Sequence, residues 1–219
     1  MKKFELTSEF VTFLGKKLFR IKALISFGNV EEGELGGYVE KEENLSNDGN
    51  AWVHGNAMVY GDAEVSGDAM VYGDARVSGN ARVCGNARVC GNAEVSGNAW
   101  VYGDAEVYGD ARVYGNARVC GNARVCGNAR VYGDARVYGD ARVYGDADYA
   151  TVHGFGSEYR TTTFFRTKAG DIGVRCGCFY GTLEEFRAKV KETHGETKTA
   201  KEYLMVADLM EFRFSKEEA

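Results

Sequence analysis

The chain has 219 residues, a formal net charge of -5, 29 glycines and no proline. Its length allows one or two domains with an adequate core, and its mild acidity excludes a general nucleic-acid binder, which needs a clustered positive field. No apolar run approaches the length of a membrane span and no secretory leader is visible, so we expect a cytoplasmic protein with no membrane partner.

Residues 1–50 are predicted to form an N-terminal β cap, because they do not follow the repeat found after them. The stretches KKFELT and KKLFRIKALISF are typical of strands, and GNVEEG is typical of a turn. Val39, Leu45 and Ala51 are six residues apart, which predicts an imperfect first coil starting near Leu35.

Residues 51–148 are a hexapeptide repeat. Every sixth residue from Val53 to Val143 is valine, sixteen in all, and each is followed by x-Gly-Asn/Asp-Ala. A period of six fits neither a helix nor a long strand. Each unit is therefore predicted to be a very short strand with valine and alanine pointing inward, followed by a corner made by glycine and Asn or Asp.

Three such units close a triangular coil of 18 residues, and stacking of the coils buries the valines. The segment RVCGNARVCGNA at residues 82–93 recurs at 118–129, a shift of two coils. An aliphatic residue followed four places later by a small one, as in Val143 and Ala147, resembles the motif of the hexapeptide-repeat proteins. This resemblance implies a mainly β fold, a left-handed parallel β-helix, for residues 51–148.

Residues 149–219 are predicted to form a small C-terminal α+β domain, because Val152 follows Val143 by nine residues instead of six. TTTFFRTK and DIGVRCGCFY are typical of a β-hairpin that turns at AGD. TLEEFRAKVKETHG is typical of a helix, with Thr182 and Glu185 as its capping box and Gly195 at its end.

A second helix is predicted over AKEYLMVADLM, with Thr199 and Glu202 as its capping pair, and the EFRF after it could be a strand. The layout as a whole, with LGGYVEKEENLS before the repeat and CGCFYGTLEEF after it, resembles uncharacterised hexapeptide-repeat proteins of bacteria and their phages. Some of those proteins carry a polymer-forming label. The resemblance implies a bacterial or phage origin, but it does not imply any particular reaction.

The β-helix resemblance also raises an enzymatic alternative, a hexapeptide-type acyltransferase with a catalytic histidine at an inter-subunit site. Such enzymes usually interrupt their coils with a protruding loop, whereas sixteen units here run without insertion. His54, the histidine inside the repeat, occupies an outward slot that other units fill with Tyr, Ser or Cys. Carbonic anhydrases on this fold need three histidines, and His54, His153 and His194 are widely spaced.

The cysteines predict neither a disulfide framework nor a metal site. Four of them, Cys84, Cys90, Cys120 and Cys126, replace a repeat residue. Cys176 and Cys178 are expected on one face of a strand, which could be half of a metal site with His153 or His194, but a single CxC pair is weak compared with paired CxxC motifs. We expect packed or surface thiols, no metal and no cofactor.

The outward slots carry the candidate binding residues, because eight of those after valine hold Tyr and nine of those before it hold Arg. Aromatic and Arg ladders stabilise sheets without any ligand, so we expect substitution of Tyr138 by Ser, the residue in the same slot of three units, to be mild. The alternative is a binding face. No acid lies between Ala111 and Gly133, which predicts a basic girdle. The candidate residues are Arg112, Arg118, Arg124, Arg130, Tyr114 and Tyr132.

These observations favour a non-enzymatic β-solenoid scaffold or interaction protein, which we expect to be a homo-oligomer with a protein partner. The acyltransferase remains one alternative. The other is a protein that binds or sequesters a small anionic or nucleotide ligand, which the girdle would suit.

Overall fold

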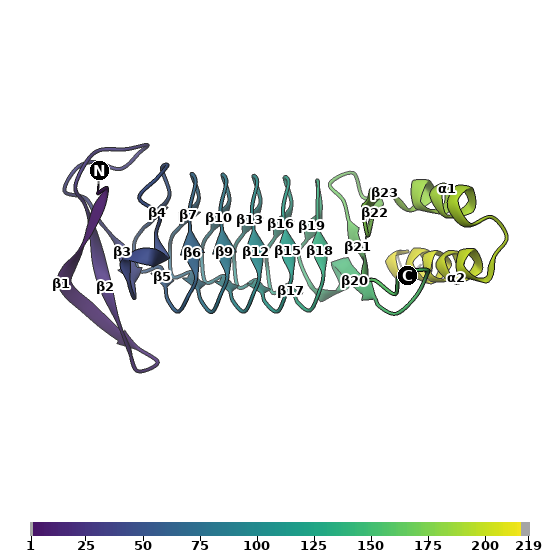
Figure 1. The fold of residues 1–219 in the computed structure, drawn as a ribbon, viewed down its shortest axis with the longest axis horizontal. Coiled ribbons are helices and arrows are strands. Elements are labelled where there is room, and N and C mark those ends of the chain that lie inside the picture. The colour runs from purple at the N-terminus through teal and green to yellow at the C-terminus, as the bar shows by residue number, and fades with distance from the viewer. Residues whose placement is uncertain (1, 216–219) are drawn as a thin grey trace.

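The computed structural model describes residues 2–215, and it is a rod with three parts (Figure 1). Long strands form one end, a three-sided solenoid forms the shaft, and a small sheet with two helices forms the other end. The prediction of a mainly β protein with a repeat shaft, N-terminal strands and a C-terminal α+β region is confirmed.

The N-terminal strands lead directly into the solenoid. β1 (Phe4–Phe13) and β2 (Lys16–Ala23) form an antiparallel hairpin, and β3 (Leu35–Val39) lies antiparallel to β2. The other edge of β3 pairs in parallel with the strand at Met58 and Val59. An isolated bridge joins Leu45 to Val65. The irregular coil below the repeat therefore begins at β3.

Each repeat unit contributes a strand of two residues, an outward residue and its valine. The strands are β4 (Trp52–Val53), β5 (Met58–Val59), β6 (Glu64–Val65), β7 (Met70–Val71), β8 (Arg76–Val77), β9 (Arg82–Val83), β10 (Arg88–Val89), β11 (Glu94–Val95), β12 (Trp100–Val101), β13 (Glu106–Val107), β14 (Arg112–Val113), β15 (Arg118–Val119), β16 (Arg124–Val125), β17 (Arg130–Val131), β18 (Arg136–Val137) and β19 (Arg142–Val143). From β4 to β16, each strand pairs in parallel with the strand three units later, as Val89 does with Val107. The result is three flat sheets, one on each side of the shaft.

The interior of the shaft is built only from small aliphatic side chains. The repeat valines and the repeat alanines from Ala51 to Ala141 are buried, with relative exposures of 0% or 1%, whereas Ala147, in the turn that ends the repeat, is exposed. The corner glycines from Gly55 to Gly139 have positive φ, and most of them stack closely on the glycine of the next coil: a Cβ on Gly97 (φ 69°) would lie 3.0 Å from the backbone nitrogen of Gly115. A side chain at this position would therefore be strained by both its backbone conformation and its neighbour.

The residue after each corner glycine forms a ladder along the edge of the shaft. The Asn92 side-chain amide donates to the Asp110 carboxylate (2.9 Å), and Asn116 donates to Asp134 (3.0 Å). Along two edges Asn and Asp alternate, and along the third Asp62 and Asp134 are separated by three asparagines. No Asp of the repeat therefore stacks directly on another Asp, which avoids like-charge repulsion between coils.

The C-terminal region begins with a short 3-10 turn (Asp146–Asp148) and a four-stranded antiparallel sheet. Its strands are β20 (Tyr149–Val152), β21 (Thr162–Arg166), β22 (Ile172–Cys176) and β23 (Phe179–Thr182). The predicted hairpin is confirmed, since β21 pairs with β22. However, Cys178 lies in the turn between β22 and β23, so it does not share a strand face with Cys176.

Helices α1 (Leu183–His194) and α2 (Lys198–Phe214) follow the sheet. The capping box of α1, Thr182 with Glu185, is confirmed. For α2 the predicted cap was wrong, because Thr197 is the N-cap and accepts from the Ala200 amide. The predicted strand at EFRF was also wrong, because the buried face of α2 continues to Phe214.

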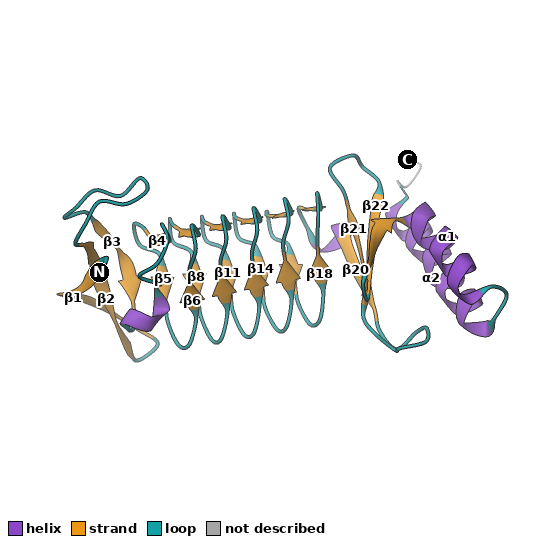
Figure 2. Cartoon of the chain, turned by 45° about the horizontal axis from the view of Figure 1, so that its top comes forward, coloured by secondary structure: helices purple, strands orange, loops and turns teal. Residues whose placement is uncertain are grey.

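The N-terminal end of the shaft is covered by the strands β1, β2 and β3 (Figure 2), and side-chain hydrogen-bond donors close it. Lys3 Nζ donates to the carbonyls of Ala51 (2.9 Å) and Gly49 (3.3 Å), and the Asn44 amide donates to those of Gly61 (3.0 Å) and Ala63 (2.8 Å). Between coils, Gly and Ala carbonyls in these positions accept from the coil below, as Ala69 does from Trp52. Two buried side chains thus replace a missing coil.

The C-terminal end of the shaft is closed by two side-chain hydrogen-bond acceptors and by the aromatic ring of Phe165. The Arg136 amide donates to Thr163 Oγ1 (2.9 Å), and the Arg130 amide donates to the Asp146 carboxylate (2.8 Å). Phe165 of β21 is fully buried in the same apolar cluster as the last valines. Both ends of the ladder therefore have partners within the chain.

Candidate functional site

The six candidate residues lie on the last coils of the shaft, and four of them share one face. Arg112 and Arg130 are directly paired on β14 and β17, and Tyr114 and Tyr132 follow these two strands. Arg118 on β15 and Arg124 on β16 lie on the other two faces. The arginines therefore surround the shaft, but only one face combines Arg with stacked Tyr.

The expectation that the arginines meet no acid was wrong. Arg124 Nε lies 3.0 Å from Glu106 Oε2, and Arg112 Nε lies 3.5 Å from Glu94 Oε2. These acids are 18 residues earlier in the chain, one coil below, so a charge count along the sequence does not find them. Within residues 2–215, the Arg118 and Arg130 guanidinium groups form no ion pair. Arg118 lies over the Trp100 ring instead.

Tyr114 and Tyr132 begin an aromatic ladder that continues into the C-terminal domain. Their rings stack 5.4 Å apart at 15°, and Tyr132 meets Tyr149 of β20 edge-on at 6.4 Å. Tyr149 is buried, while Tyr114 is 37% and Tyr132 53% exposed. The two outer rings therefore leave much of their apolar surface in contact with water.

A second tyrosine column, on the face of β12, β15 and β18, is structural instead. The hydroxyls of Tyr102 and Tyr138 lie 2.9 Å apart across the intervening Cys120. Tyr138 packs on the shaft core and lies under the Arg175 guanidinium. Burial, followed by these hydrogen bonds, raises the pKa of Tyr102 above its usual range. Tyr138 is thus not interchangeable with Ser in the way that the repeat indicates.

The exposed ladder ends at a cavity of about 430 Å³ between the shaft and α2. Tyr132, Asp146 and Tyr149 line one side, and Met210 and Arg213 of α2 line the other. Within residues 2–215, Arg213 forms no ion pair. This junction joins the candidate face of the shaft to the C-terminal helix.

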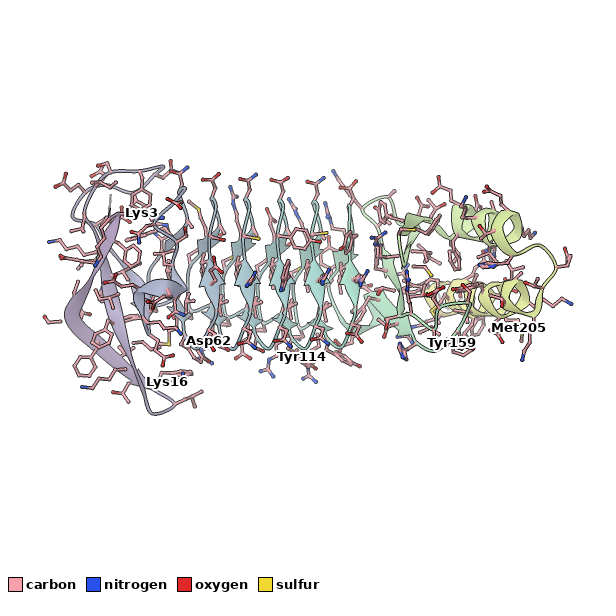
Figure 3. All side chains as sticks on the ribbon, in the orientation of Figure 1. Lys3, Lys16, Asp62, Tyr114, Tyr159 and Met205 are labelled. Carbon is pink, nitrogen blue, oxygen red and sulfur yellow. The ribbon has the colours of Figure 1, made fainter. Side chains whose placement is uncertain are left out.

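Helix α2 carries an apolar stripe that sequence analysis missed. Met205, Leu209 and Phe212 are 71%, 57% and 79% exposed, although large apolar side chains are usually covered. Their spacing of four and three residues places them on one side of the helix, opposite the buried Tyr203, Met210 and related residues. In Figure 3 the labelled Met205 and Tyr114 both lie along the lower side of the rod.

The remaining candidates do not come together as a metal or catalytic centre. Within residues 2–215 no group of three His, Cys, Asp or Glu side chains is placed to hold a metal ion. His54 Nδ1 lies 3.5 Å from Glu34, and burial lowers the pKa of His54. His153 contacts Thr161, and His194 stacks on Tyr203, so the three histidines lie apart.

The repeat matches a known family of solenoid repeats. The family model described as the YdcK beta solenoid repeat matches residues 63–79, 75–91, 87–103, 105–121, 117–133, 123–136 and 135–147. The chain is therefore a β-solenoid repeat protein. No curated protein matches the chain. Neither helix of the described residues has the length and apolarity that crossing a membrane requires.

Proposed function

We propose that this protein is a non-enzymatic scaffold that holds another protein along one side of its rod. The observation that carries the proposal is the exposed Tyr114–Tyr132 ladder beside Arg130 and Arg213, which continues toward the apolar stripe of α2. Tyr and Arg are the residues that most often dominate binding at protein interfaces. Neither Tyr114 and Tyr132 nor the stripe of α2 belongs to a buried core cluster, so both offer apolar surface to a partner.

The proposed partner has an acidic surface with apolar side chains on it. The arginines favour acidic groups, and the rings and the α2 stripe offer apolar area. A second copy fits the shaft face less well, because a two-fold pairing there would set Arg112 and Arg130 against the same arginines. Homo-oligomer formation through another face remains a prediction.

Quantitative affinity capture tests this proposal with a matched control. The test variant carries Tyr114→Ser and Tyr132→Ser, and the control carries Tyr72→Ser and Tyr144→Ser, whose rings are similarly exposed, at 37% and 55%, on another face. We expect wild type and control to retain a partner that the test variant loses. Capture of the same proteins by all three would contradict the proposal.

The acyltransferase alternative is tested separately. The shaft runs from β4 to β19 at a constant spacing of six residues, with no inserted loop to build a substrate groove. We therefore expect no thermal shift with acyl-coenzyme A. A saturable shift would favour the enzyme, and a shift with free nucleotides would favour the binder of small anionic ligands.

A further inference from the structure

The C-terminal domain contains a second cavity, which the scaffold role does not use. It has a volume of about 300 Å³ and lies between the turn joining β22 to β23, the loop before β21, and helices α1 and α2. This volume is at the lower end of the range for small-molecule sites. A ligand with one ring and a short side chain would fill it.

Aromatic side chains form the walls of this cavity. The Phe186 ring lies 5.6 Å from those of Phe179 and Tyr203, edge-on to the latter, and the His194 imidazole stacks on Tyr203 at 5.8 Å. All four side chains line the cavity. Such walls favour a planar apolar group, which can stack on one ring and meet the edge of another.

The inner end of the cavity is polar but uncharged. The Tyr203 hydroxyl lies 3.9 Å from Cys176 Sγ, which accepts from Thr162 Oγ1 at 3.2 Å. Burial, with the neighbouring Cys176, raises the pKa of Tyr203 to about 12, so the phenol is neutral near pH 7. The backbone of Gly156 approaches this hydroxyl so closely that no Cβ would fit there.

The rim of the cavity carries more positive than negative groups. Arg160 and Lys189 both line the cavity, and Glu158 is the acidic residue that lines it. Arg160 pairs with Glu158 at 3.4 Å and Lys189 with Glu192 at 3.0 Å, and all four side chains in these pairs are more than half exposed. Exposed pairs of this kind are weak, so a carboxylate can compete for both cations.

We propose that this cavity binds a small aromatic carboxylate. The ring lies against the aromatic wall that Phe179, Phe186 and Tyr203 form, and the carboxylate reaches Arg160 and Lys189 at the rim. Charge-assisted hydrogen bonds from these cations select an acid over a neutral or basic compound of the same shape. A metal ligand set is not formed here, because residues 2–215 hold no suitable cluster of three side chains.

Calorimetric titration of the full chain with phenylacetate tests the proposal. We expect saturable 1:1 binding, at least tenfold tighter than that of 2-phenylethanol or 2-phenylethylamine, and none with acetate. Bound phenylacetate should also slow alkylation of Cys176 relative to Cys84, which lies in the repeat. Equal binding of the alcohol or the amine would overturn the assignment to a carboxylate.

Two variants locate the site. Thr193→Trp places a large ring at an exposed position of α1 that lines the cavity, and it should abolish binding while the circular dichroism spectrum stays unchanged. Arg160→Gln with Lys189→Gln should weaken binding at least tenfold, whereas Lys198→Gln with Lys201→Gln, which removes the same charge elsewhere on the domain, should not. Absence of saturable binding to wild type, or full binding by Thr193→Trp, would overturn the proposal.

Discussion

The shaft and the C-terminal domain solve the same problem, burial of apolar side chains, in opposite ways. In the shaft every inward position repeats, so Val119 has the same surroundings as Val101 and Val137 above and below it. In the domain each buried residue, such as Phe164 or Phe186, has neighbours of its own. The comparison teaches that a solenoid interior filled by Val and Ala leaves no room for a site, so specific recognition has to use outer slots and the terminal domain.

The largest effect should come from a charge inside the shaft. Val119→Asp places a carboxylate among aliphatic side chains without a partner, and we expect a loss of about 3–5 kcal/mol or complete unfolding. The control Arg88→Ser changes an exposed outward residue of the same repeat and should cost less than about 0.5 kcal/mol. Thermal unfolding measures both. Equal melting temperatures would contradict the inward and outward assignment.

A smaller effect should separate the two tyrosine columns. Tyr138→Ser removes a half-buried ring, its bond to Tyr102 and its contact with Arg175, and we expect a loss of about 2 kcal/mol. Tyr132→Ser removes an exposed ring and should cost about 0.5–1 kcal/mol. Urea denaturation distinguishes them. If Tyr132→Ser were the more damaging change, the ladder at Tyr114 would be structural.

The edge ladders predict an effect of like charges. Asn92→Asp stacks three acids, because Asp74 and Asp110 lie one coil below and above, and we expect a loss of about 0.5–1 kcal/mol. Asn98→Asp is the matched control, since its neighbours Asn80 and Asn116 are uncharged. The difference between the two variants should shrink in high salt and below about pH 4. If the difference in stability between the two variants did not change with salt or pH, repulsion between the carboxylates would be excluded as its cause.

A further effect, on the pH dependence of stability, concerns Lys3 at the closed N-terminal end. Burial lowers the pKa of Lys3 from 10.5 to about 8, so between these values the unfolded chain binds more protons than the folded chain. The contribution of Lys3 to stability is therefore complete above pH 10.5 and is lost as the pH falls through 8. Urea melts at pH 7.0 and 9.5 should show wild type gaining stability relative to Lys3→Met. Parallel changes in both proteins would place the titration elsewhere.

The shaft could be predicted because its chemistry is local and repeated. Val, Gly and Ala at a fixed spacing specify strand, corner and interior without reference to the rest of the chain. The girdle was misjudged for the opposite reason, since the partner of Arg124 is Glu106, one coil away rather than nearby in the sequence. Reading charges at a spacing of 18 residues would have found both this pair and the Asn and Asp ladders.

In the C-terminal domain the errors came from alternatives that only packing decides. Thr197 and Thr199 are both suitable caps, and the structure uses the first, whose hydroxyl accepts from the Ala200 amide. Gly177, with φ 56°, makes a two-residue hairpin turn that removes Cys178 from the strand. The α2 stripe had a readable signal, the spacing of Met205, Leu209 and Phe212, but it overlaps the similar spacing of the buried face.

The central claim is that the two ends of the rod are closed, so that copies do not stack end to end, and that its outer surface is available to a partner. Sedimentation velocity of the full chain, from micromolar to millimolar concentration, tests this claim most directly. Because Lys3, Asn44, Thr163 and Phe165 close the two ends, we predict one discrete species whose mass does not grow with concentration. A mass that rises steadily, with filaments in the electron microscope, would show that the ends stack and would contradict this account.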